Sequence, residues 1–174
     1  MRKLVLVGLL LGLLAGWTCL AAKPTIAVVM KTFINDPFMV NIANFAKARG
    51  EDLGAVVEVY AASSHAAVEE QISIVESLIA RKVDAIILAP LDSNALSPVI
   101  NEATDAGIPV ILVDTDAYNA NYVTLIATGN VRAAKLAADY AAMLLNFKGK
   151  VAQIEGDPTE QTAIDRRRGF HEGI

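Results

Sequence analysis

AIILAPLDSNALSPVINEATDAGIPVILVD, residues 85–114, is the stretch that decides the fold class. The apolar runs at its two ends, Ala85–Ala89 and Val110–Val113, are typical of short strands that are buried on both faces of a parallel sheet. Gly107 stands where a helix between these strands would end in the left-handed conformation. The apolar side chains of that helix recur at helical spacing and are Leu96, Val99, Ile100 and Ala103. The stretch therefore predicts a strand, a helix and a second strand parallel to the first.

The same alternation of strand-like and helix-like segments continues through the chain from Lys23 onward. The other strand-like runs are Thr25–Met30, Val56–Tyr60 and Tyr122–Ala127. Residues 65–82 carry an apolar stripe at helical spacing, formed by Val68, Ile72, Val75 and Ile79. Because strand–helix–strand units with short links close with a right-handed crossover, we predict an α/β fold with a doubly wound parallel sheet.

Residue types at the expected helix ends agree with this order. Asp36 is a favoured helix-capping residue, and Pro37 follows it at the first helical position. Gly54, like Gly107, is placed to end a helix before the next strand. The apolar residues of the helix between Asp36 and Gly54 are Phe38, Ile42, Phe45 and Leu53.

The C-terminal segment follows the same pattern. Lys150–Glu155 predicts a sixth strand, and Gln161–Ile174 predicts the start of a helix with no strand after it. Since a strand–helix unit needs a neighbour to cover it, we expect a chain truncated within a second α/β lobe. The apolar faces of Val151, Ile154 and Phe170 would then have little to pack against.

Residues 1–22 have the layout of a secretory signal peptide. Two basic residues precede the apolar run Leu4–Ala15, and small residues follow it. That run is shorter than the about 20 residues that a membrane span needs. We therefore predict export to the periplasm, with cleavage after Ala21 or Ala22. We do not expect lipid attachment at Cys19, because the residues before it lack the leucine and the paired small residues of a lipid-attachment site.

Composition excludes several classes of chemistry. Cys19 is the only cysteine and would leave with the signal peptide, so the mature chain would have no disulfide, no cysteine nucleophile and no zinc–thiolate site. The chain has 15 basic and 19 acidic residues, and loss of Arg2 and Lys3 would leave 13 and 19, changing the net charge from -4 to -6. No basic cluster could neutralise a phosphate backbone, so we expect no nucleic-acid partner. The sequence also predicts no cofactor and no metal site.

Polar side chains gather where the predicted strands end, which is where open parallel sheets bind their ligands. The main candidates are Lys31, Asp36, Phe38 and Met39 after the first strand, Asp114, Thr115 and Asp116 after the fourth, and Glu160 and Asp165–Arg168 after the sixth. Carboxylates accept hydrogen bonds from sugar hydroxyls, arginine donates them, and an aromatic ring covers the apolar face of a sugar. The set therefore indicates a small polyhydroxylated ligand.

Several of these residues also have a purely structural explanation. Asp36 is compatible with a helix cap alone, Phe38 with core packing, and Asp114 with a turn at a strand end. His65 is expected to be a surface residue at a helix start, on the opposite sheet edge.

One motif suggests an enzyme instead. The strand Val110–Val113 followed by Asp114 and Asp116 is similar to the strand-then-D-x-D motif of haloacid-dehalogenase-type phosphatases. In that family the motif follows the first strand of the catalytic domain, whereas here it follows the fourth.

Five segments, in order, carry a resemblance to a known family: Ile26–Met39, Ala85–Ser93, Gly107–Asp114, Ile126–Asn130 and Val151–Phe170. They resemble the type I periplasmic sugar-binding proteins of ABC transporters, which include the ribose-, allose- and galactose-binding proteins. The resemblance spans residues 23–174. It implies the type I periplasmic binding protein fold, with an N-terminal α/β lobe at residues 23–128 and the incomplete start of a second, similar lobe at residues 129–174.

The resemblance also implies roles for the residues of the first loop. Asp36 matches the residue that binds sugar hydroxyls, and Phe38 matches the aromatic residue that stacks on the sugar ring. Met39 stands where many members carry a second aromatic residue. Lys31 matches a lysine that contacts the ligand in allose-type members.

Further along the chain, Asp114 matches a hydroxyl-binding aspartate, and Arg166 matches an arginine that reaches the ligand from the second lobe. Thr115 replaces the arginine of the ribose binders. Ala89 and Gly129 are two further departures, which leave the identity of the sugar open.

The implied function is that of a periplasmic solute-binding protein, not an enzyme. It would capture a monosaccharide in a cleft between lobes and deliver it to the membrane permease of an ABC transporter, with a chemoreceptor as a further candidate partner. The alternatives are an exported phosphatase-like enzyme using Asp114 and Asp116, and a truncated chain without independent activity. Because even micromolar binding needs about 8 kcal/mol, we expect half a cleft to bind sugar weakly or not at all.

Overall fold

The computed structural model describes residues 22–174. The predicted signal peptide lies outside these residues apart from Ala22, and so does Cys19. Within the described part of the chain, no helix combines the length and the apolar character needed to cross a membrane.

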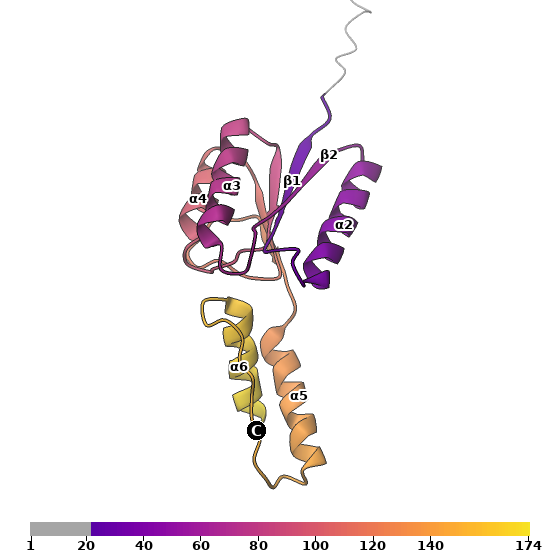
Figure 1. Cartoon of the computed structure of the whole chain (residues 1–174), viewed down its shortest axis with the longest axis vertical. Coiled ribbons are helices and arrows are strands. Elements are labelled where there is room, and N and C mark those ends of the chain that lie inside the picture. Colours follow the sequence, from indigo (N-terminus) through magenta and orange to yellow (C-terminus); the bar gives the residue numbers. More distant parts are fainter. Residues whose placement is uncertain (1–21) are drawn as a thin grey trace, which may run out of the picture.

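Five parallel strands form one sheet in the order β2-β1-β3-β4-β5 (Figure 1). The strands are β1 (Thr25–Met30), β2 (Val56–Ala61), β3 (Ala85–Leu88), β4 (Val110–Val113) and β5 (Thr124–Ile126). The strand order reverses beside β1, which pairs with β2 on one side and with β3 on the other. The predicted α/β fold with a parallel sheet is thus confirmed.

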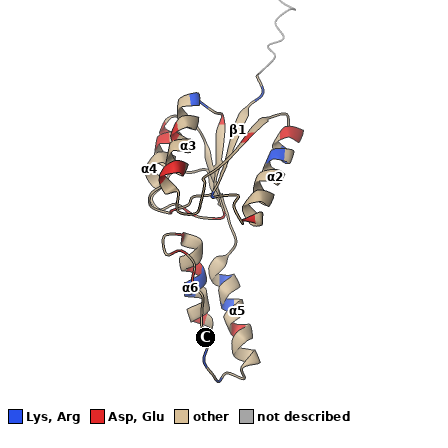
Figure 2. Ribbon diagram, viewed as in Figure 1, with Lys and Arg blue, Asp and Glu red and all other residues tan. Residues whose placement is uncertain are grey.

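Helices cover both faces of the sheet (Figure 1). On one face lies α2 (Pro37–Asp52), and on the other lie α3 (Val68–Arg81) and α4 (Ser97–Asp105). Alternate residues of β1 lie on opposite faces of the sheet. Val28 packs into the core under α2, whereas Val29 packs into the core under α3 and α4. The strands are nearly free of charged residues, and the helices carry both signs (Figure 2). Such strands suit a sheet that is buried on both faces.

The predicted helix ends are confirmed. The carboxylate of Asp36 accepts a hydrogen bond from the backbone N–H of Met39 at 3.0 Å, and Pro37 opens α2. Gly54 and Gly107 have φ angles of +85° and +82°, in the left-handed region that glycine enters without steric cost. These residues keep the links between helices and strands short.

The chain leaves the sheet after β5 and forms two helices that pack against each other, α5 (Asn130–Leu144) and α6 (Gln161–Gly173). Both lie beyond the edge at which the strands end (Figure 1). Gly173 makes this close packing possible, since a Cβ atom there would lie 2.7 Å from the Cβ of Ala138.

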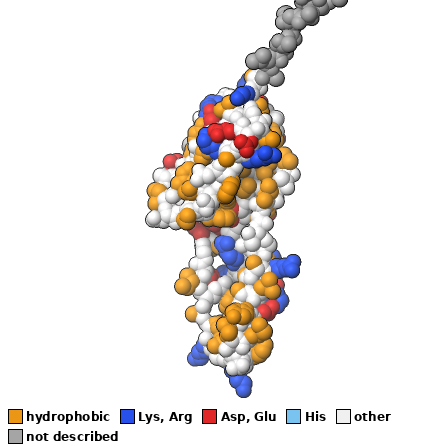
Figure 3. Space-filling view, turned by 90° about the vertical axis from the view of Figure 1, so that its right-hand side faces the viewer, with side chains coloured by type: hydrophobic (Ala, Val, Ile, Leu, Met, Phe, Trp, Pro, Cys, Tyr) orange, Lys and Arg blue, Asp and Glu red, His pale blue; other side chains and the backbone are white. Residues whose placement is uncertain are grey.

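The strand predicted at Lys150–Glu155 is not formed, and that prediction is wrong. The segment runs between α5 and α6 without a strand ladder, because the neighbouring elements are helices and offer no sheet edge to pair with. Ile154 is 99% exposed and Val151 is 45% exposed, as the sequence led us to expect, whereas Phe170 on α6 is partly buried. Figure 3 shows apolar side chains gathered on the surface of this part of the molecule. The exposed ones of α5 include Leu136, Tyr140, Met143 and Leu144.

A buried glutamine joins the two central strands. The side-chain amide of Gln71, on α3, donates to the backbone carbonyl oxygens of Met30 at 3.2 Å and Ala89 at 2.9 Å. Its oxygen accepts from the N–H of Leu91 at 2.8 Å. Gln71 is fully buried, so these three backbone groups depend on it for their hydrogen bonds at the ends of β1 and β3.

We expect Gln71→Leu to lower the free energy of unfolding by about 2–4 kcal/mol, because leucine leaves buried donors and acceptors unpaired. Urea denaturation measures this loss. The control is Glu76→Gln, an exposed change on the same helix, which should stay within about 0.5 kcal/mol of the wild type. A Gln71→Leu protein as stable as that control would contradict the bridging role of Gln71.

Candidate ligand site

A cavity of about 440 Å³ lies where the carboxyl ends of the strands meet the first turns of α5 and α6. Six of the seven site residues predicted from the sequence line it. The full lining is Lys31, Asp36, Phe38, Met39, His65, Asp114, Thr128, Asn130, Glu160, Thr162 and Arg166. The predicted residues therefore converge on one cavity, with the exception of Thr115.

Lys31 is the electrostatic centre of the cavity. Its Nζ lies 2.7 Å from Oε2 of Glu160 and 3.1 Å from Oδ2 of Asp114. The lysine side chain is only 3% exposed, so its charge is compensated by these two carboxylates rather than by bulk water. Its position follows from the strand, because Lys31 is the first residue after β1.

Asp114 is held in a specific orientation. Its backbone has a φ angle of +65°, a left-handed conformation that aspartate tolerates better than most residues. The hydroxyl of Thr115 donates to Oδ2 of Asp114 at 2.8 Å. Thr115 itself is fully buried and does not line the cavity, so its structural role is to orient the neighbouring carboxylate.

Asp36 and His65 face each other at the cavity. Nε2 of His65 lies 3.7 Å from Oδ2 of Asp36, while Oδ1 of Asp36 caps α2. The sequence-based placement of His65 on the opposite sheet edge is wrong. Because Met30 of β1 pairs with Ala61 of the parallel strand β2, the loop after β2 opens on the same edge as Lys31. His65 should have been a candidate for that reason.

Phe38 and Met39 differ in exposure although they are neighbours. Phe38 is 55% exposed and also borders an adjoining apolar hollow beside Ile42 and Ile126, so its ring is not part of the core. Met39 is buried in the core between α2 and the sheet and contributes only to the wall of the cavity. The ring of Phe38 is thus available to stack on a ligand.

Arg166 reaches the cavity from α6. Its guanidinium donates to Oδ1 of Asn130, the first residue of α5, at 3.3 Å. The amide of Asn130 donates in turn to the carbonyl oxygen of Thr128 at 3.1 Å. This chain of contacts fixes Arg166 relative to the connection between the sheet and α5.

Glu160 and Thr162 also line the cavity; the sequence placed Glu160 among the strand-end candidates without giving it a role in binding, and did not select Thr162. Glu160 is the N-cap residue of α6, and the hydroxyl of Thr162 lies 3.3 Å from its carboxylate. The available signal was position, since an acidic residue at a helix start next to a strand-end loop is suited to contact a cation there. Nearby, the pKa of Asp157 is lowered, mainly because the hydroxyl and the N–H of Thr159 donate to its carboxylate and also because Lys31 and His65 add positive potential.

The two aspartates of the D-x-D motif have separate surroundings. Asp114 contacts Lys31 in the cavity, whereas Asp116 accepts hydrogen bonds from the phenol of Tyr122 at 2.8 Å and from the N–H of Ala117 at 2.7 Å. The bond to Asp116 raises the pKa of the Tyr122 phenol. Among residues 22–174, no group of three or more His, Cys, Asp or Glu side chains is arranged to hold a metal ion.

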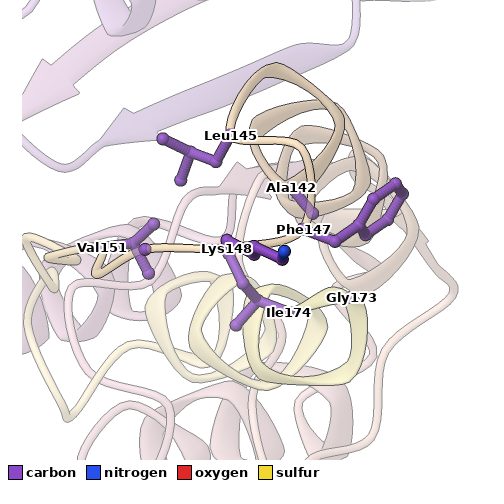
Figure 4. A pocket seen from close by; sticks show the side chains of 8 residues that line it. Ala142, Leu145, Phe147, Lys148, Val151, Gly173 and Ile174 are labelled. Atoms are coloured by element: carbon purple, nitrogen blue, oxygen red, sulfur yellow. The ribbon is translucent and has the colours of Figure 1, made fainter.

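A second hollow of about 200 Å³ lies at the far end of α5 and α6 and has a different character. Figure 4 shows Leu145, Phe147, Val151 and Ile174 around it, with Lys148 as the only charged side chain. Because this hollow offers almost no hydrogen-bonding side chains, it is not suited to a polar ligand. The cavity at Lys31 instead combines carboxylates, cations, an amide and hydroxyls with an aromatic face, which suits a compact polyhydroxylated molecule.

Residues 26–174 match the model of the periplasmic binding protein domain. The chain is 33% identical over 147 residues to the ribose import binding protein of Bacillus subtilis (strain 168), covering 84% of this chain and 47% of that protein. Over 135 residues it is 36% identical to the galactofuranose-binding protein of Escherichia coli (strain K12), covering 75% of this chain and 42% of that protein. The chain thus spans about half the length of the curated relatives it matches.

Solved structures that are similar to this chain are also solute-binding proteins. A solute-binding protein from Agrobacterium vitis with bound D-fucose matches with a TM-score of 0.80 at 33% identity, over 86% of this chain and 52% of that chain. A periplasmic solute-binding protein from Actinobacillus succinogenes with bound D-allose matches with a TM-score of 0.78 at 30% identity, over 87% of this chain and 55% of that chain. The relatives named here are binding proteins rather than enzymes. The chain therefore belongs to the periplasmic binding protein family, and its fold is that of the type I sugar-binding members.

Proposed function

We propose that this protein binds a monosaccharide in the cavity around Lys31 and does not transform it. The observation that carries the proposal is the convergence of Asp36, Asp114 and Arg166 with the exposed ring of Phe38 on one cavity. The carboxylates accept from hydroxyls, the arginine donates to ring and hydroxyl oxygens, and the ring covers the C–H face of a sugar. The relatives with bound D-allose and D-fucose support a sugar as the ligand.

We further propose that the cavity lies between two lobes. Residues 23–128 would form the first lobe and residues 129–174 the start of the second, because α5 begins directly after the chain leaves the sheet. In such proteins, closure of the lobes over the ligand supplies affinity and a signal for the transporter. The partner would be the membrane permease of an ABC transporter, with a chemoreceptor as a second candidate.

Residues 1–22 would be the signal peptide for export to the periplasm. The support for this proposal is the sequence pattern of a short basic start, an apolar run and small residues near Ala21. The chain belongs to the periplasmic binding protein family, which supports a periplasmic location.

Substitution of the hydroxyl-binding acids tests the proposed site. In a version of the chain extended through a complete second lobe, we expect Asp114→Asn to weaken sugar binding by about 1.5–3 kcal/mol, because a charge-assisted hydrogen bond is lost. Asparagine keeps the shape and tolerates the left-handed backbone at this position. Calorimetric titration with pentoses and hexoses at up to millimolar concentration measures the effect. Asp116→Asn, outside the cavity, is the matched control and should bind as the wild type does.

The two roles of Asp36 can be separated in the same titration. Asp36→Ala should lower both stability and affinity, whereas Asp36→Ser retains an oxygen that caps α2 and should lower affinity alone. We expect the loss of affinity to be about 1.5–3 kcal/mol in both variants. Unchanged affinity in Asp36→Ser would remove this carboxylate from the ligand site and leave it only its capping role.

A phosphatase assay tests the enzyme alternative. If Asp114 and Asp116 formed a metal-dependent pair, magnesium would raise the melting temperature and phosphate esters would be cleaved. We expect neither effect, because Asp116 is engaged by Tyr122 rather than directed at the cavity. Ester turnover that disappears in Asp114→Asn would contradict the binding-protein proposal.

A further inference from the structure

The ion pair between Lys31 and Glu160 joins two distant parts of the chain. Lys31 directly follows β1, and Glu160 directly precedes α6, 129 residues later in the chain. The Nζ–Oε2 distance is 2.7 Å, and the two side chains are only 3% and 14% exposed. A charge-assisted bond with this burial is screened far less by solvent than a surface ion pair.

Ser93 makes the same connection with backbone groups. Its N–H donates to the carbonyl oxygen of Thr159 at 3.2 Å, and its hydroxyl oxygen accepts from the N–H of Gln161 at 3.1 Å. Ser93 is fully buried after β3. Residues 159–161 are therefore held against the sheet edge at three points, one of them ionic.

This contact also governs the geometry of the two cationic side chains in the cavity. The ammonium group of Lys31 donates a hydrogen bond to Glu160 and forms an ion pair with Asp114, so these two carboxylates set its position in the cavity. Glu160 is immediately followed by α6, the helix that carries Arg166 to Asn130. A displacement of Glu160 would therefore move both Lys31 and Arg166.

We propose that Glu160 is a positioning residue that clamps the start of α6 to the sheet edge, and so orients Lys31 and Arg166. Its effect on affinity rests on the proposed function, whereas the clamp itself does not.

Hydrogen exchange tests the clamp. In Glu160→Gln, which keeps the shape and removes the charge, we expect the amides of Ser93 and Gln161 to exchange about 10-fold faster than in the wild type. The amide of Ala89, bonded to the carbonyl oxygen of Val29 within the sheet, should be unchanged and reports that the sheet is folded. Glu160→Asp, which keeps the charge, should restore part of the protection.

The matched control is Glu155→Gln, which removes a carboxylate from the same segment. Glu155 pairs with Arg167 at 3.5 Å, but both side chains are about half exposed, at 48% and 54%. This variant should leave the exchange of Ser93 and Gln161 unchanged. Equal exchange in Glu160→Gln and Glu155→Gln would overturn the clamp.

Sugar titration of the same variants, each extended through a complete second lobe, separates this inference from the proposed function. Affinity about 10-fold lower in Glu160→Gln, partly restored in Glu160→Asp, supports the orienting role. Faster exchange with unchanged affinity would overturn that role. If the extended wild type binds no sugar in the panel while Glu160→Gln still exchanges faster, the clamp stands and the proposed function fails.

Discussion

The parallel direction of all five strands is the constraint on which the site depends. Met30 pairs with Ala61, and Val29 pairs with Leu88, so β1, β2 and β3 end at nearly the same level. The loops that follow them, although distant in sequence, must open on one edge. Gln71 strengthens this arrangement, because it satisfies backbone groups at the ends of both β1 and β3. The sheet therefore presents an array of loop residues at positions set by backbone hydrogen bonds.

Charge compensation within the cavity follows from that array. A lysine as buried as Lys31 would be costly without anionic partners, and Asp114 and Glu160 would repel each other without the ammonium group between them. The two contacts of Lys31 are mutually dependent. Its partner Asp114 comes from the sheet edge, and its partner Glu160 comes from the start of α6. The two parts of the chain are thus connected through the same side chains that face the cavity.

Much of this could be predicted from the sequence, for identifiable reasons. The bounds of β1 were predicted correctly from a short run rich in Val and Ile, and two helix ends were predicted from Gly54 and Gly107. These signals lie in the local sequence. Five site residues were found because they follow β1 or β4, whose ends place residues at the sheet edge, whereas Arg166 on α6 was found through the family resemblance. The strand at Lys150–Glu155 and the partner of Glu160 were not predictable in this way. Both depend on contacts made far along the chain, which local composition does not encode.

The balance of charges in the cavity argues for a neutral ligand. Three carboxylates, those of Asp36, Asp114 and Glu160, face two permanent cations, Lys31 and Arg166, of which Lys31 is already shared by two acids. A phosphate placed about 5 Å from an uncompensated carboxylate would cost roughly 3 kcal/mol at an effective dielectric constant of about 20. Sugar hydroxyls can instead donate to the remaining acceptor positions of these carboxylates, and the exposed ring of Phe38 gains area only from a ligand with an apolar face. Within the proposed function, the arrangement therefore favours an unmodified monosaccharide over its phosphorylated forms.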